Sequence, residues 1–367
     1  MRIALIYLGR RGGGATYSLE IAKGLARKAE VLAVISQQSW NLGAWRDAGL
    51  CLVEVPTYHN AWRVIPSTLN FRKHFVLRRE IQRFRPDVLY YPMLHLWTPL
   101  LNWMFPSLPK VVTIHDPVLH RGERNPVVAL IQQKAIRQAT RVIILSRVFV
   151  DVMRQQGVPC EHIDVIPCGE FSYYSRMSSS QKDPHPPTLL FFGHISEYKG
   201  LEILLKAFPI VKKQIPQARL FVVGSGNLDS YRSQLESLED VFVINHWVRD
   251  EEIATYFRQA DVLVAPYTDA SQSAVIPVAY AFKIPVVATQ VGGIPEQVED
   301  GKTGLLVPPG DVGKLAEACI QLLTNVNKAA KLGQLGYKKA MQEWNWEYIA
   351  DRVLVSLENA YEEHTRV

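Results

Sequence analysis

The segment "LLFFGHISEYKGLEILLKAF", residues 189–208, combines residue types suited to binding a phosphate group. An apolar run ends at Gly193, a polar loop carries Lys199, and Gly200 precedes an amphipathic run. The amino end of a helix carries partial positive charge, so a lysine beside it favours an anion such as a pyrophosphate. The alternative is an exposed lysine without a ligand. The succession of strand, loop, Lys-Gly and helix favours the binding role.

A second candidate is the glycine-rich stretch "YLGRRGGGATYS", residues 7–18. Gly12, Gly13 and Gly14 lie between a predicted strand and a predicted helix, where glycine lets the backbone approach a ligand closely. The spacing is not GxGxxG, and no acidic residue follows at the distance expected for a ribose contact, which disfavours a dinucleotide-dependent dehydrogenase. A flexible turn without a ligand is the alternative.

A third candidate is "DVLVAPYTDASQSAVIPVAY", residues 261–280. Proline is accepted in a helix mainly within its first turn, so Pro277 predicts a helix that begins near residues 271–273, with Ser273 as its N-cap. The free amides of Gln272, Ser273 and Ala274 would then form an anion site.

A histidine also follows a buried strand, in "VVTIHD", residues 111–116. The carboxyl ends of parallel strands are where open α/β sheets bind ligands, so His115 is a candidate functional residue. The alternative is a structural histidine.

The elements that must position these residues alternate from end to end of the chain. Continuous apolar strands followed by amphipathic helices predict parallel sheets covered on both faces. We therefore expect an α/β protein with two doubly wound, Rossmann-like domains that face a central cleft. The predicted first domain spans residues 1–171, a Ser- and Pro-rich linker spans 172–187, and the second domain spans 188–345. A last helix, about 346–367, is expected to pack back on the first domain.

Composition limits the partners of the protein. The chain of 367 residues has a net charge of +6, and residues 1–170 carry 22 Lys and Arg against 12 Asp and Glu, a net charge of +10. A basic first half suits an anionic substrate or an anionic membrane, whereas no nucleic-acid-binding motif accompanies the charge, so no nucleic-acid partner is expected. The four cysteines lack metal-ligand spacing, and the amino terminus does not have the pattern of a signal peptide. We expect a cytoplasmic protein without a bound metal.

These motifs together resemble the retaining nucleotide-sugar glycosyltransferases of family 4, which have the GT-B fold. The resemblance spans nearly the whole chain and is most specific in "KIPVVATQVGGIPEQVEDGKTGLLVPPGD", residues 283–311. It implies a nucleotide diphosphate sugar as donor substrate, with no cofactor and no metal. UDP-sugars are the favoured donors and GDP-sugars the second choice.

The resemblance also assigns roles to individual residues. Lys199 matches the lysine that contacts the donor phosphates, and His115 matches a histidine that contacts the transferred sugar. The residues expected to bind the donor are Gly12, Gly13, Gly14, Gly193, His194, Lys199, Trp247, Val248, Ser271, Gln272, Ser273 and Ala274.

Three positions depart from the family pattern. His194 stands where the family usually has an arginine, and Ala270 and Val278 stand where it has a pair of glutamates. Asp269 is the candidate to replace the first glutamate, so His115, Lys199 and Asp269 are the predicted catalytic residues. Two further hypotheses follow from the departures: a nucleotide-sugar-binding pseudoenzyme or scaffold, and an epimerase of the GT-B fold, which the loss of acid/base side chains disfavours.

The acceptor is expected on the first domain. The basic run at 71–87 and the aromatic run "YYPMLHLWTPLLNWMFPSLPK", residues 90–110, predict an amphipathic surface for anionic lipid. We therefore expect a glycan or lipid-linked acceptor, with the protein peripheral at the inner membrane face. The alternative is that these aromatic side chains pack in the core.

Overall fold

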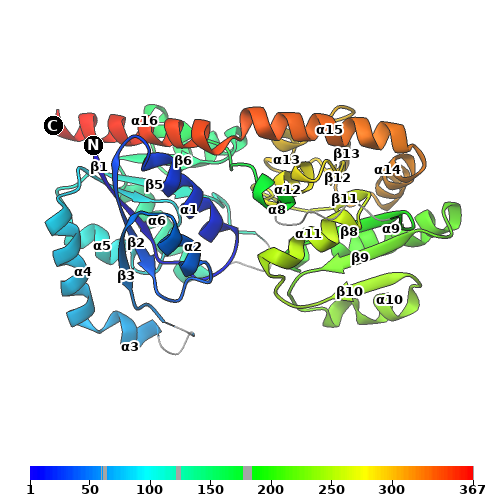
Figure 1. The fold of residues 1–367 in the computed structure, drawn as a ribbon, viewed down its shortest axis with the longest axis horizontal. Coiled ribbons are helices and arrows are strands. Elements are labelled where there is room, and N and C mark those ends of the chain that lie inside the picture. The colour runs from blue at the N-terminus through cyan, green and yellow to red at the C-terminus, as the bar shows by residue number, and fades with distance from the viewer. Residues whose placement is uncertain (59, 61–63, 121–124, 177–183, 367) are drawn as a thin grey trace. The chain divides into compact units, whose positions relative to one another are not determined.

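The computed structural model describes residues 1–367 except 59, 61–63, 121–124, 177–183 and 367. The chain divides into two compact units (Figure 1). The first unit consists of residues 1–119, 124–168 and 346–367, and the second of residues 120–123 and 169–345. Each unit contains one parallel β-sheet with helices packed around it, so the predicted pair of Rossmann-like sheets is confirmed.

The first unit is built on a seven-stranded sheet in the order β3-β2-β1-β4-β5-β6-β7. Its strands are β1 (Arg2–Tyr7), β2 (Glu30–Ser36), β3 (Cys51–Val55), β4 (Val88–Tyr91), β5 (Lys110–Ile114), β6 (Arg141–Ile144) and β7 (Ile163–Val165). Its helices are α1 (Gly13–Leu25), α2 (Leu42–Asp47), α3 (Val64–Thr68), α4 (Phe71–Phe84), α5 (Thr98–Met104), α6 (Pro126–Gln138), α7 (Val150–Gln155) and α16 (Trp346–Thr365). Successive residues of β1 point to opposite faces, and all of Ile3–Tyr7 are buried, because helices cover both faces.

Helix α16, the last helix of the chain, belongs to the first unit and packs against α1 (Figure 1). Several polar contacts hold it there. Lys28 forms an ion pair with Asp351 at 2.6 Å, and the buried Arg141 contacts both Asp164 on β7 and Glu363 on α16. The chain therefore returns to its first sheet after it has completed the second.

The second unit has a six-stranded sheet in the order β10-β9-β8-β11-β12-β13. Its strands are β8 (Thr188–Phe192), β9 (Arg219–Val223), β10 (Val241–Ile244), β11 (Val262–Ala265), β12 (Val286–Thr289) and β13 (Gly304–Val307). Its helices are α8 (Ser172–Arg176), α9 (Leu201–Gln214), α10 (Arg232–Ser237), α11 (Asp250–Arg258), α12 (Val275–Ala281), α13 (Ile294–Gln297), α14 (Val312–Thr324) and α15 (Val326–Glu343). Helices α9 and α14 pack together over one face of this sheet, where Leu189, Phe191 and Val262 belong to the same apolar core.

In each sheet the order of the strands reverses at one place, which we call the switch point. In the first unit β1 lies beside β4, and in the second unit β8 lies beside β11. The loops at the carboxyl ends of such neighbouring strands diverge to opposite sides and leave a place for a ligand. The predicted glycine stretch follows β1, and the predicted Lys199 and Asp269 loops follow β8 and β11.

Three sequence predictions need correction. The predicted linker at 172–187 contains helix α8, which Tyr174 ties to α11 by a hydrogen bond to Asp250 at 3.0 Å; residues 177–183 of that stretch lie outside the described residues. Helix α15 was not predicted. The three glycines do not all lie before the helix that follows β1: α1 starts at Gly13, so of Gly12, Gly13 and Gly14 only Gly12 precedes it.

The aromatic stretch at 90–110 lies mostly in the core. Tyr90, Tyr91, Trp97 and Phe105 are all buried, and of the aromatic residues there only Trp103 is largely exposed, at 74%. The packing alternative is therefore right for most of this stretch. None of the described helices combines the length and the apolar character needed to cross a lipid bilayer.

Candidate functional site

Lys199 stands at the switch point of the second sheet. It ends a short 3-10 turn, Glu197–Lys199, and Gly200 then caps helix α9. Its ammonium nitrogen lies 4.0 Å from the ring centre of Tyr267 and 5.0 Å from that of Tyr198. Both distances are within the range of attraction between a cation and an aromatic face. Two rings from two loops therefore hold this charge at the carboxyl edge of the sheet.

The environment keeps Lys199 charged. Burial acts to lower the pKa of Lys199, but its interactions with the hydroxyl groups of Tyr267 and Tyr198 outweigh burial, and the pKa lies above its ordinary value. A lysine in this state is a cation at neutral pH. It is therefore suited to bind a phosphate group.

Gly200 brings the two loops of the site together. Its φ of +70° lies in the left-handed region, and a Cβ atom there would approach the carbonyl oxygen of Pro266 to 1.9 Å. Any side chain would force the Lys199 loop away from the segment after β11. A glycine is thus required for the two tyrosines to reach Lys199 together.

Asp269 contacts a histidine that the sequence prediction missed. Its Oδ2 atom lies 3.0 Å from Nδ1 of His120, which is buried. The imidazole ring of His120 stacks on Tyr198, with ring centres 4.3 Å apart and planes inclined by 19°. Its Nε2 atom lies 3.4 Å from Oγ of Ser271, a long hydrogen bond. His120 thus joins the two loops of the site from a distant part of the sequence.

The segment that replaces the family motif is held rigidly, but differently from the prediction. Helix α12 begins at Val275 with Ala274 as its N-cap, so Ser273 is not the N-cap, although its Oγ accepts from the Val275 amide at 3.3 Å. The amide of Ser273 is not free. It donates to Oε1 of the buried Gln297 at 2.8 Å, and Gln297 Nε2 donates back to the Ser273 carbonyl at 3.0 Å.

This clamp removes the predicted Ser273 amide from an anion site. Oγ of Ser273 also bonds to the hydroxyl of Tyr267 at 3.0 Å, so the segment is tied to the ring that faces Lys199. Ala270 and Val278, at the positions of the family's glutamates, are both buried. Both side chains are apolar, so neither supplies a carboxylate to a ligand.

The other predicted donor contacts of the second unit lie in two loops: Gly193 and His194 precede Lys199 in the loop after β8, and Trp247 and Val248 lie in the loop after β10. Gly193 has a φ of +115°, His194 is exposed, Trp247 is 42% exposed and Val248 is buried. His194 lines an open polar hollow of about 1010 Å³ with Glu197, Asn227 and Tyr231 among the other lining residues. No contact in the described part of the chain joins His194 to Lys199.

The predicted residues of the first unit lie in the loops after β1 and β5. Gly12 has a φ of +92° and caps α1, and a Cβ atom at Gly14 would meet the Met93 side chain at 2.9 Å. His115 follows β5, and its Nε2 lies 2.8 Å from the carbonyl oxygen of Pro92, to which it donates. Burial is the main cause that lowers the pKa of His115, so the ring is neutral at pH 7.

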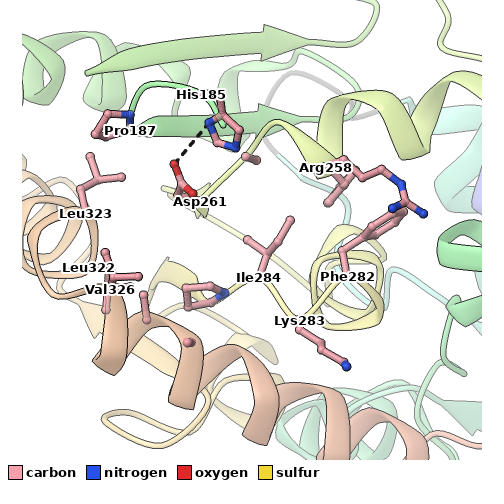
Figure 2. Close-up of a pocket in the computed structure, with 15 residues that line it drawn as sticks. His185, Pro187, Arg258, Asp261, Phe282, Lys283, Ile284, Leu322, Leu323 and Val326 are labelled. Carbon is pink, nitrogen blue, oxygen red and sulfur yellow. Dashed lines mark ion pairs between the residues drawn. The ribbon is translucent and has the colours of Figure 1, made fainter. Parts of the chain in front are cut away.

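A second hollow lies at the opposite edge of the second sheet (Figure 2). Its volume is about 440 Å³, and its walls include Pro187 before β8, Asp261 before β11 and Ile284 before β12. Nδ1 of His185 there lies 3.7 Å from Oδ2 of Asp261. These are the amino ends of the strands, the edge away from the switch-point loops, so this His-Asp pair is separate from the candidate site.

Sequence reasoning found Lys199, Gly200 and Asp269 but missed His120, Tyr198, Tyr267 and Gln297. Gln297 lies in "GGIPEQVEDG", where it is one of several polar residues, so nothing local marks it as the buried one. His120 lies 149 positions from Asp269, and nothing in the spacing links them. Only the fold brings these residues together.

Two family profiles match this chain. The profile described as "Glycosyltransferase Family 4" matches residues 11–169, and that described as "Glycosyl transferases group 1" matches residues 186–325. The chain belongs to glycosyltransferase family 4. The two matches follow the two units and include every loop of the candidate site.

Known proteins agree with this membership. A D-inositol 3-phosphate glycosyltransferase from Pseudarthrobacter chlorophenolicus is 28% identical over 97% of this chain and 92% of its own length. A GDP-mannose-dependent α-(1-6)-phosphatidylinositol monomannoside mannosyltransferase from Mycolicibacterium smegmatis is 31% identical over 44% of each chain. The crystal structure of Anabaena HepE with UDP and glucose superposes with a TM-score of 0.77 at 18% identity, over 98% of this chain and 100% of that one. This glycosyltransferase has the GT-B fold.

Proposed function

We propose that this glycosyltransferase moves a hexose, with retention of configuration, from a nucleotide diphosphate sugar to a glycan or lipid-linked acceptor. The observation that carries the proposal is the charged Lys199, which two tyrosine rings hold beside the Asp269 loop at the switch point. A cation suits the diphosphate, and a carboxylate suits the hydroxyl groups of a sugar. The two charged groups therefore support a nucleotide sugar as the ligand.

The chemical roles follow from these charges. Lys199 would stabilise the negative charge that develops on the departing phosphate. The phosphate itself would accept the proton of the acceptor hydroxyl as the new glycosidic bond forms and the sugar-phosphate bond breaks. No side chain then needs to act as a general base, and no metal is required. A neutral His115 has one N–H group, which donates to the Pro92 carbonyl. It would have to give up that hydrogen bond in order to donate to the sugar.

The base of the donor is proposed as uridine or guanosine. HepE structures contain UDP with glucose and UDP-glucose, which supports a UDP-sugar. The Mycolicibacterium relative is GDP-mannose-dependent, which supports a GDP-sugar. The exposed ring of Trp247 and the backbone of Val248 are the proposed contacts of the base.

The proposed acceptor is borne by a membrane, and helix α4 is the proposed docking surface. Phe75 and Val76 are 68% and 57% exposed. Arg72, Arg79 and Arg83 are three, four or seven positions away from Val76, so they share its face of the helix. Exposed apolar side chains among cations are typical of a helix that lies on anionic lipid. We propose that the protein works peripherally at the cytoplasmic membrane face.

A second candidate function is nucleotide-sugar binding without turnover. The buried, apolar Ala270 and Val278 favour it, because the carboxylates that the family carries at these positions are lost. The retention of Lys199 and Gly200 argues against it, because a protein that had lost its donor site would not need to keep a lysine and a glycine there.

Thermal-shift titration tests the proposal. The purified protein is heated with UDP, GDP, ADP and their common sugar conjugates, because a ligand that binds only the folded state raises the melting temperature. A shift with one nucleotide identifies the donor class, and transfer to an acceptor extract then separates an enzyme from a binding protein. A lack of any shift at millimolar ligand would contradict the proposed function.

A further inference from the structure

Only one of the two carboxylate oxygens of Asp269 has a hydrogen-bond partner among the described residues. Its Oδ2 atom is bound by His120, while its Oδ1 atom has no partner among the described residues, and the side chain is 40% exposed. A carboxylate oxygen that accepts no hydrogen bond from the protein is available to accept one from a ligand. The exposed oxygen lies in the segment next to Ala270, where the family carries its first glutamate.

His120 restricts where that oxygen can point. Nδ1 of the imidazole donates to Asp269, Nε2 faces the hydroxyl of Ser271, and one face of the ring covers Tyr198. With Nδ1 protonated, Nε2 can accept from the Ser271 hydroxyl, so one neutral tautomer satisfies both partners. These contacts, in three directions, hold the buried ring in the observed orientation.

Lys199 and Asp269 carry opposite charges and therefore suit different parts of a nucleotide sugar. Tyr198, which stacks on His120, also contacts the ammonium of Lys199, the proposed diphosphate contact. A carboxylate repels a phosphate but accepts from hydroxyl groups. The exposed oxygen of Asp269 is therefore suited to the sugar and not to the diphosphate.

We propose that His120 is a positioning residue that holds Asp269 as the reader of the transferred sugar's hydroxyl groups, in place of the missing glutamate. This inference rests on the proposed function, since it assumes a nucleotide sugar at the site. Ser271 and Tyr198 complete the arrangement by fixing the imidazole ring.

Two substitutions of His120 separate its contacts. His120→Phe keeps an aromatic ring for Tyr198 but loses the donor to Asp269. His120→Asn loses the ring but places an amide N–H close to the position of Nδ1. The matched control is His185→Phe, which alters the other His-Asp pair of the same unit, at the opposite edge of the sheet (Figure 2).

The measurement is calorimetric titration of each variant with UDP and UDP-glucose, or with GDP and GDP-mannose if the wild type binds those. We expect His120→Phe to raise the Kd of the nucleotide sugar about tenfold, because one hydrogen bond to a charged group is lost. The Kd of the free nucleotide should stay within about twofold of the wild-type value. His120→Asn should recover most of the loss, and His185→Phe should change neither value.

A double variant tests whether His120 acts through Asp269. In an Asp269→Ala background, His120→Phe should cause no further loss of nucleotide-sugar affinity. An additive loss, an equal loss for nucleotide and nucleotide sugar, or no rescue by His120→Asn would overturn the inference while the proposed function stands. A wild type that binds neither ligand would overturn both.

Discussion

At the scale of the residue, Lys199 is the most strongly constrained group of the site. Two aromatic rings flank its ammonium group, its charge is retained at neutral pH, and its neighbour Gly200 tolerates no side chain. Lys206 lies on the next element, helix α9, where it is exposed and pairs with Glu202. The two lysines allow a controlled comparison.

Lys199→Ala is predicted to weaken nucleotide binding. Loss of a charge-assisted contact with the diphosphate should raise the Kd by about 10- to 100-fold, as measured by calorimetric titration with UDP or GDP. Lys206→Ala is the control and should leave the Kd unchanged, since an exposed i,i+4 ion pair contributes little. An unaltered Kd for Lys199→Ala would remove this lysine from the binding site.

At the scale of the element, the loop between β11 and α12 depends on α13. Gln297 at the end of α13 makes a pair of hydrogen bonds with the backbone of Ser273, much as a neighbouring strand would. The hydroxyl of Tyr280 on α12 donates to Oγ1 of Thr303 at 2.8 Å and lies 3.4 Å from the Gln297 carbonyl oxygen, so buried side chains surround the clamp. A polar clamp inside an apolar layer explains how a loop without the family's glutamates keeps its shape.

Gln297→Leu is predicted to destabilise the second unit. Leucine has a similar volume, but it would leave the amide and the carbonyl of Ser273 buried without partners, which costs about 2–4 kcal/mol of unfolding free energy. Urea-induced unfolding measures this loss. Gln290→Leu changes an exposed glutamine of the same stretch and should have an effect within about 0.5 kcal/mol. Equal stability of the two variants would contradict the clamp.

At the scale of the whole molecule, charge is divided between the two halves of the chain. The cations of the basic first half include the arginines of α4, which share a face with the exposed Phe75 and Val76. An acceptor held at a membrane would be reached most readily by a protein that binds the same surface. A docking surface on α4 would therefore favour an acceptor that is bound to the membrane.

Flotation with liposomes tests this surface. The wild type should float with vesicles that contain anionic lipid at low salt and remain in solution at high salt, because salt screens the attraction. Replacing Arg72, Arg79 and Arg83 by Glu should abolish flotation. The control replaces Arg27, Arg154 and Arg232 by Glu, which gives the same change in net charge at exposed positions outside α4. If both triple variants lost flotation equally, α4 would not be the docking surface.

The class of the fold, the two sheets and the family can all be recognised from the amino-acid sequence. Parallel strands that are buried on both faces must be apolar, which gives continuous apolar runs in the sequence. The left-handed backbone after Lys199 favours glycine, which gives the Lys-Gly pair. The position of Asp269 in a loop after a strand can be recognised in the same way.

The partners of these residues depend on the three-dimensional fold. His120 meets Asp269 because the fold brings two distant loops together, and no local pattern encodes that contact. Likewise, the start of α12 was misplaced because the backbone of Ser273 is satisfied by the side chain of Gln297 instead of by a helix cap. Local sequence fixes which groups need hydrogen-bond partners, and long-range packing selects the partners that they find.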